Sequence, residues 1–247
     1  MKFNDRNIKM ILRLVFMFVS FFLVYNLSST VWAKDTVSQQ KQWVGTWAAS
    51  PQLVEAYNMP PSPGLTNNTL RQIVRVSIGG EQIRIKLSNE YGNSPLEINS
   101  LHIAESIGSG VIKSKTGKTV TFGGSNSVTI LPGQTVISDT LDYELPKMTN
   151  IAVTIYFGST PTYLTGHPGS RTTSYICIGD ALDVSGMFSA VTTDHWYIIT
   201  GIDILTNDLN KAAVVCLGDS ITDGRGSTTN KNDRWPDNLA ARLQENK

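Results

Sequence analysis

The chain has 247 residues, of which 40% are hydrophobic, and its 21 basic residues nearly balance its 20 acidic ones. A net charge of +1 argues against a nucleic-acid-binding protein, and two cysteines are too few for a disulfide-stabilised scaffold. The 20 glycines and 10 prolines favour a turn-rich β protein, and the length fits one large domain or two small ones.

Residues 1–33 have the pattern of a secretory signal peptide. A mostly apolar run over residues 14–27 is followed by a small-residue cleavage pattern that ends at Ala33. Four basic residues precede the run: Lys2, Arg6, Lys9 and Arg13. We therefore predict secretion, with cleavage after Ala33. The minority alternative is an uncleaved N-terminal membrane anchor, since a bilayer span needs about 20 apolar residues and this stretch reaches that length only with the mostly polar residues 26–30.

The mature chain offers no electrostatic reason to bind a polyanion. Removal of residues 1–33 takes away four of the 21 basic residues and one of the 20 acidic ones, which leaves 17 and 19. This slight negative balance favours neither nucleic acid nor an anionic membrane surface. We therefore expect no nucleic acid and no stable membrane partner.

From Trp43 to Leu205 the side chains alternate with a period of two, which predicts a β-sandwich or jelly roll over residues 34–212. The clearest element is a predicted hairpin, in which residues 74–78 and 83–87 alternate on either side of a turn over residues 79–82. Further strands are predicted at residues 96–103, 128–130, 151–157, 174–178 and 196–205.

The pattern changes near residue 212. Residues 212–217 are continuously apolar, as expected for a parallel strand buried on both faces, and Pro236 begins a helix pattern. Residues 213–247 are therefore predicted to be the first unit of an α/β domain. One strand and one helix cannot cover each other, so we expect the rest of that domain to be missing from this chain and its start to pack loosely or fray.

Ser220 stands between the predicted strand and the predicted helix. A serine there is held in a tight turn at the carboxyl end of the sheet, where its hydroxyl can attack a carbonyl and its backbone N–H can help to hold the oxyanion. Gly218 lets the backbone approach closely, and the Asp219 carboxylate can accept hydrogen bonds from nearby N–H groups.

Residues 218–224, with Gly-Asp-Ser at 218–220, resemble the first block of the SGNH, or GDSL-type, esterases and lipases. The likeness continues at residues 225–227 and 234–237. Three upstream segments are similar to the β domain that precedes the SGNH domain in a subgroup of secreted esterases, including arylesterases encoded with xylan-degrading enzymes: residues 43–51, 87–92 and 171–175.

The resemblance implies a flavodoxin-like parallel sheet around Ser220, which would be the nucleophile and first oxyanion donor. Gly218, Asp219, Asp223 and Gly224 would support it. The family's second glycine donor, its G-x-N-D asparagine and its D-x-x-H pair follow the nucleophile, and this sequence has none of them there.

The three histidines fail the D-x-x-H pattern, because the residues three positions earlier are asparagine, leucine and threonine. We interpret His102, His167 and His195 as surface or loop histidines of the β domain. A serine without its base loses most of its activation, so we expect this chain alone to be nearly inactive.

The resemblance thus predicts a secreted carboxylic-ester hydrolase that acts on acylated carbohydrates or small acetyl or aryl esters through an acyl-enzyme, with no cofactor and no metal. The alternatives are a carbohydrate- or partner-binding module with a vestigial catalytic block, and a scaffold that only docks against the missing domain.

Three further features remain. Trp43, Trp47 and Trp196 could form a sugar-stacking platform, but ordinary packing of aromatics is favoured. Cys177 and Cys216 are expected to be buried reduced thiols on separate strands. Asp223 and Arg225 could either shape a pocket or lie in a surface turn.

Overall fold

The computed structural model describes residues 9–10, 13, 16–17 and 40–245. The chain divides into two compact units, Met1–Gln40 and Lys41–Lys247. The described residues from 9 to 17 are helical. The predicted cleavage position after Ala33 and most of the predicted signal peptide lie outside the described residues. Among the residues described, no helix is long and apolar enough to cross a membrane.

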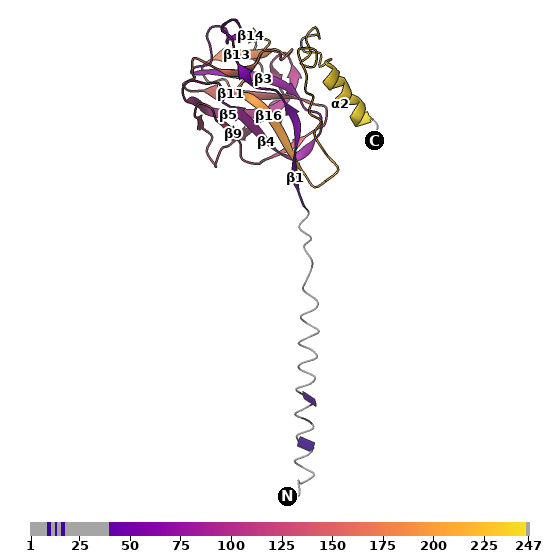
Figure 1. Ribbon diagram of the computed structural model, residues 1–247. Helices are drawn as coiled ribbons and strands as arrows, with labels where there is room; N and C mark the ends of the chain where they lie inside the picture. The colour runs from indigo at the N-terminus through magenta and orange to yellow at the C-terminus, as the bar shows by residue number, and fades with distance from the viewer. Residues whose placement is uncertain (1–8, 11–12, 14–15, 18–39, 246–247) are drawn as a thin grey trace. The chain divides into compact units, whose positions relative to one another are not determined.

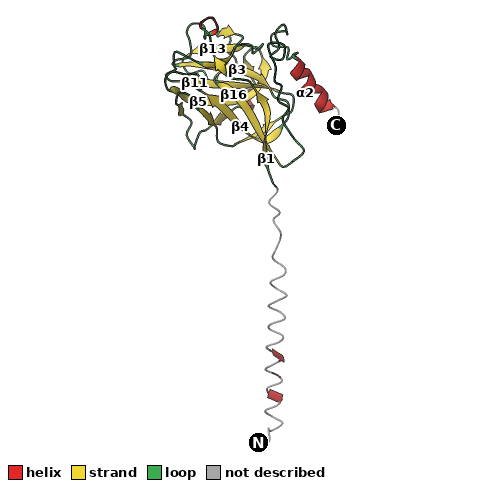
Figure 2. Ribbon diagram, in the orientation of Figure 1, coloured by secondary structure: helices red, strands yellow, loops and turns green. Residues whose placement is uncertain are grey.

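The second unit is mainly β, as predicted, and its ladders are antiparallel (Figure 1; Figure 2). One sheet has the order β1-β16-β4-β10, with β9 also paired to β4: β1 (Gln42–Ala48), β4 (Gly80–Ser88), β9 (Thr135–Ile137), β10 (Leu141–Leu145) and β16 (Ile199–Thr206). We call residues 41–206 the β region.

A second, larger sheet has the order β14-β13-β3-β11-β5-β6, with β7 and β8 also paired to β5. Its strands are β3 (Asn68–Arg75), β5 (Leu96–Gly108), β6 (Val111–Ile112), β7 (Lys118–Val120), β8 (Val128–Ile130), β11 (Asn150–Phe157), β13 (Ser174–Ile178) and β14 (Val191–Thr193). A small third sheet joins β2 (Gln52–Leu53), β12 (Thr165–His167) and β15 (Trp196–Tyr197). The helical elements are the 3-10 turns η1 (Ala56–Asn58) and η2 (Ser114–Thr116) and the helix α2 (Trp235–Glu245).

The two larger sheets share one hydrophobic core. Aliphatic side chains with period two point into it from both sides, and each contributes roughly 1.5–3 kcal/mol by leaving water. The first sheet supplies Val44, Ile83, Ile85, Leu87, Ile202 and Ile204, and the second supplies Leu70, Val74, Leu101, Ile103, Ile151, Val153 and Ile155. The alternation seen in the sequence identifies the buried face of β4, whereas β3 and β11 are buried on both faces.

The predicted hairpin over residues 74–87 is wrong. β3 pairs with β11 and β13 in the larger sheet, whereas β4 pairs with β16, β10 and β9 in the other. The segment between them crosses from one sheet to the other, so the two apolar faces meet across the core. Alternation identifies which face of a strand is buried, but it does not identify the partner strand.

The other predicted strands are found. Residues 128–130 and 174–178 match β8 and β13, and residues 96–103 and 151–157 fall within β5 and β11. The predicted strand at 196–205 is split into β15 and β16 at Ile198, whose φ is +68°. A left-handed conformation is rare for a β-branched residue, and here it moves the chain from the small sheet into the first one.

The predicted parallel strand at residues 212–217 does not form, so the α/β unit is not present in the described chain. These residues are not assigned to a strand, and Val214, Val215 and Leu217 are 65%, 87% and 96% exposed. The physical reason is that a parallel strand needs a neighbour for its backbone groups, and β16 already pairs with β1 and β4. The predicted helix does form, as α2, and it buries none of its residues.

The two cysteines are free thiols, but their environments differ from the prediction. Cys177 is half-buried on β13, where desolvation raises the pKa of its thiol. Cys216 is also half-buried, and it lies in the segment that forms no strand. The prediction of buried thiols is therefore wrong for both cysteines, and the prediction of a strand is correct only for Cys177.

Tyr197 is expected to make stability fall at high pH. It is fully buried on β15, its hydroxyl donates to the Asn58 carbonyl at 2.7 Å, and burial raises its pKa to about 12. Because an unfolded tyrosine titrates near pH 10, the unfolded state loses a proton between about pH 10 and pH 12 that the folded state keeps. The free energy of unfolding, measured by urea titration, should therefore decrease as pH rises through this window.

The matched comparison is Tyr197→Phe against Tyr163→Phe, since Tyr163 is 58% exposed. Tyr197→Phe should show a weaker decrease above pH 10, and Tyr163→Phe should follow the unsubstituted protein. Parallel curves for all three proteins would contradict the assignment to Tyr197.

Candidate functional site

Ser220 lies in a compact, exposed turn that we call the serine turn, residues 218–227. The Asp219 carboxylate accepts the Ile221 N–H at 3.0 Å, as the sequence predicts for this residue. Two backbone hydrogen bonds also close the turn: the Asp219 carbonyl accepts the Asp223 N–H at 3.0 Å, and the Ser220 carbonyl accepts the Arg225 N–H at 2.7 Å. These bonds hold Ser220 in the turn while leaving the residue open to solvent.

Two glycines make this turn possible. A Cβ at Gly218 would overlap the Thr222 hydroxyl. Gly224 has a φ of +95°, and a Cβ there would overlap the Arg234 side chain. Any larger residue at either position would therefore push the turn apart.

The turn is not mounted on a sheet as the sequence analysis expects. The residues before it form no strand, and helix α2 begins eight residues after the turn ends. What holds it instead is the β region. We call residues 167–173, from the last residue of β12 to the residue before β13, the anchor loop.

The first contact joins His167 and Asp223. His167 Nε2 lies 2.6 Å from Asp223 Oδ1, and its Nδ1 lies 2.9 Å from the Ser50 carbonyl oxygen. Their side chains are 14% and 33% exposed, so water competes only in part for this bond. A hydrogen bond to a carboxylate in such a partly buried place is stronger than one on an open surface.

Further contacts follow along the anchor loop. The Asn230 N–H donates to the Arg171 carbonyl at 2.9 Å, and the Asn230 side-chain oxygen accepts the Thr173 N–H at 2.8 Å. The Arg234 guanidinium donates to the Ser170 carbonyl at 3.2 Å and pairs with Asp237 at 2.7 Å. Several residues between 223 and 234 are therefore held by specific polar contacts, which the expectation of loose packing over residues 213–247 does not describe.

Trp47 and Trp196 pack against each other and do not form an open platform. Trp196 is 2% exposed, and its ring meets Trp47 edge-on at 4.9 Å and stacks on His167 at 5.9 Å. The Arg234 guanidinium lies 5.5 Å from the Trp196 ring centroid, and Arg84 covers Trp43 at 4.3 Å. The favoured interpretation, packing of aromatics, is therefore correct.

The interpretation of the three histidines as surface or loop residues is correct for His195, but His102 and His167 are half-buried residues of strands. His102 lies on β5, where Nε2 is 2.9 Å from the Thr119 hydroxyl and Nδ1 is 3.3 Å from Asp183, and His167 ends β12. His195 does lie between strands, with Nδ1 2.7 Å from the Pro168 carbonyl oxygen. Within the described residues no hydrogen bond joins Ser220 to a histidine.

The sequence analysis missed His167, Gly169 and Ser170. The D-x-x-H search fails because the carboxylate that meets His167 comes from Asp223, 56 positions later. A usable signal was present, since the segment 171–175, already noted in the sequence, begins inside the anchor loop.

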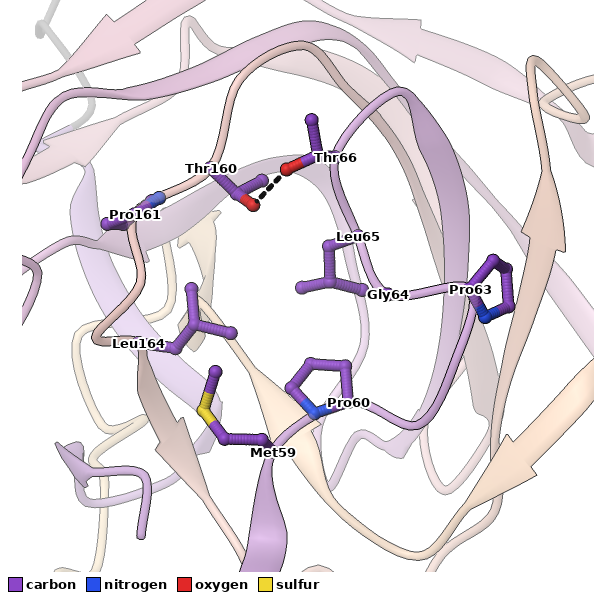
Figure 3. A pocket seen from close by; sticks show the side chains of 9 residues that line it. All are labelled: Met59, Pro60, Pro63, Gly64, Leu65, Thr66, Thr160, Pro161 and Leu164. Atoms are coloured by element: carbon purple, nitrogen blue, oxygen red, sulfur yellow. Dashed lines mark hydrogen bonds between the residues drawn. The ribbon is translucent and has the colours of Figure 1, made fainter. Parts of the chain in front are cut away.

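A separate cavity of about 180 Å³ lies in the β region (Figure 3). Leu65 and Leu164 extend into it, and the Thr66 and Thr160 hydroxyls pair with each other at 2.6 Å. The remaining lining residues are Met59, Pro60, Pro63, Gly64 and Pro161. With no acid or base in its lining, this cavity supplies no hydrolytic chemistry. In the described part of the chain, no group of three or more histidine, cysteine or carboxylate residues is arranged to hold a metal ion.

No protein-family model matches this chain, and no curated protein matches it either.

Proposed function

We propose that this chain belongs to a secreted serine ester hydrolase of the SGNH type, with the β region as its sandwich-like accessory domain and Ser220 as its nucleophile. The observation that carries the proposal is the serine turn. An exposed serine stands between two glycines that tolerate no Cβ, in a turn closed by a carboxylate cap and by backbone hydrogen bonds. This combination adds local geometry to the resemblance of residues 218–224.

In the proposed reaction the Ser220 hydroxyl attacks the ester carbonyl, and a general base takes the hydroxyl proton. The tetrahedral intermediate collapses as the alcohol leaves with a proton, and water then hydrolyses the acyl-enzyme to release the carboxylic acid. The Ser220 N–H would contribute to the oxyanion site. The resemblance implies a histidine as this base, and within the described residues none of the three histidines forms a hydrogen bond with Ser220.

The proposed substrates are acylated carbohydrates and small acetyl or aryl esters, on the strength of the resemblance. The alternative of a carbohydrate-binding module is less well supported, because Trp196 is buried and Arg84 covers Trp43. Binding to xylan that persists unchanged in Ser220→Ala, without any ester hydrolysis by the unsubstituted protein, would favour the module.

Covalent labelling tests the nucleophile directly. A fluorophosphonate probe should form an adduct with the protein expressed from the gene that encodes this chain, and peptide mass spectrometry should locate the adduct at Ser220. Ser189→Ala, at an exposed serine of the β region, is the matched control and should be labelled like the unsubstituted protein. An adduct on another residue, or labelling that persists in Ser220→Ala, would contradict the proposal.

A further inference from the structure

The contact between His167 and Asp223 joins the β region to the serine turn at the point closest in sequence to Ser220. Asp223 is three residues after Ser220, and its N–H donates to the carbonyl of Asp219, the residue before the serine. A displacement of Asp223 therefore pulls on the backbone on both sides of Ser220. No strand precedes the serine turn to hold it in place. The contact between His167 and Asp223 therefore takes over this positioning.

The His167 ring is fixed before it meets Asp223. Its backbone is in β12, where His167 pairs with Trp196 of β15, and its ring stacks on the Trp196 ring at an interplanar angle of 28°. The Ser50 carbonyl accepts from Nδ1 at 2.9 Å, which places the Nδ1 proton and directs Nε2 toward Asp223. A ring held by stacking and by a backbone acceptor loses little further freedom when it binds the carboxylate.

The anchor loop is shaped to receive this carboxylate. A Cβ at Gly169 would overlap Asp223 Oδ2, so the loop approaches Asp223 as closely as it does only because residue 169 is glycine. Gly169 does not adopt a positive φ, so its small size, and not its conformational freedom, is what the contact uses.

His167 is poorly placed to be the base itself. Nδ1 faces the Ser50 carbonyl and Nε2 faces Asp223, so both ring nitrogens are engaged. A general base needs one nitrogen free to accept the serine proton. The geometry therefore indicates a residue that acts on the nucleophile through another group.

We infer that His167 is a positioning residue supplied by the β region, which holds Asp223 and thereby fixes the turn that presents Ser220. The inference rests on the proposed role of Ser220 as nucleophile. In this inference the β region is part of the candidate catalytic site, and the anchor loop aligns the turn that contains Ser220.

Two amide substitutions separate this role from ordinary structural support. Glutamine places its side-chain N–H₂ near the position of Nε2, so His167→Gln can still donate to Asp223. Asparagine places its N–H₂ near Nδ1, so His167→Asn can still donate to Ser50 but not to Asp223. His167→Leu removes both bonds. His102→Leu is the matched control, since His102 also faces a carboxylate, Asp183, at a different place in the β region.

In the protein expressed from the gene that encodes this chain, His167→Leu and His167→Asn should lower kcat for p-nitrophenyl acetate about 10- to 100-fold with KM little changed, because misplacement of a nucleophile slows the chemical step. His167→Gln should recover most of the rate, and His102→Leu should have no effect. Recovery by asparagine but not by glutamine would overturn the inference, as would full activity in His167→Leu when Ser220→Ala is inactive.

Amide hydrogen exchange provides a readout that does not depend on catalysis. Exchange at the Asp223 and Arg225 amides should become faster in His167→Leu, His167→Asn and Gly169→Ala, and should stay near that of the unsubstituted protein in His167→Gln. Equal protection in all four variants would overturn the inference. If Ser220→Ala keeps full activity while these amides respond as expected, the proposed function fails and the physical link stands.

Discussion

Replacing Ser220 with alanine is expected to lower kcat for ester hydrolysis by about 10³-fold or more in the protein expressed from the gene that encodes this chain. The substitution removes the oxygen that would form the acyl-enzyme, whereas substrate binding and the remaining oxyanion donors are retained. The loss should therefore appear in kcat and leave KM little changed. Initial rates with p-nitrophenyl acetate and with acetylated xylan oligosaccharides measure it.

The control for this prediction separates chemistry from stability. Ser220 is exposed, so Ser220→Ala should change the free energy of unfolding by no more than about 0.5 kcal/mol. Ser189→Ala, also exposed, should keep full activity. Hydrolysis by Ser220→Ala at the rate of the unsubstituted protein would disprove the assignment of the nucleophile.

The second large effect is expected at Arg71, a fully buried arginine on β3. Its Nε donates to the Thr154 hydroxyl at 2.9 Å, its Nη1 to the Gly110 carbonyl at 2.8 Å and its Nη2 to the Val184 carbonyl at 2.7 Å. Burial lowers its pKa to about 10, so the side chain is still cationic at neutral pH. One guanidinium thus satisfies acceptors on β11 and on the loops that follow β5 and β13, and those on Thr154 and Gly110 are buried.

Arg71→Met should lower the free energy of unfolding by about 3 kcal/mol or more, because each buried carbonyl left without a donor costs about 1–3 kcal/mol. Arg71→Lys should lose somewhat less, since an ammonium keeps the charge but cannot span the same acceptors. Arg75→Met, at a half-buried position on the same strand, is the matched control.

Urea unfolding curves give the three free energies. If Arg71→Met does not fold, Arg71→Lys alone should still show a lower unfolding midpoint than Arg75→Met. Equal midpoints for Arg71→Lys and Arg75→Met would show that the buried guanidinium contributes little to stability.

The sequence predicted well what depends on local pattern. Alternation identified β8 and β13 closely, because a strand with one buried face needs period two wherever it lies in the fold. β11 was found as a mostly apolar run, since it is buried on both faces. The turn at Ser220 was also predictable, since Asp219 caps the nearby Ile221 N–H through a contact two residues away. These features require little information about distant parts of the chain.

Predictions from the sequence were wrong where a segment's structure depends on which strand it pairs with. β3 and β4 have the same alternation as a hairpin, yet each pairs in a different sheet. Residues 212–217 have the composition of a buried parallel strand, but an apolar run becomes a strand only when a neighbour accepts its backbone hydrogen bonds. An apolar composition gives a segment the tendency to form a strand, but the strand forms only where a neighbouring strand is present to pair with it.

The same division applies to the candidate site. Sequence alone determined the strand content of the β region, the helix at residues 235–245 and a serine in a glycine-flanked turn, because each depends on residues close together in the chain. Only the tertiary structure decided that His167 holds Asp223 and that Arg71 joins three segments of the β region. Those contacts link residues tens of positions apart, and no local pattern encodes which distant polar groups will meet once the strands have packed.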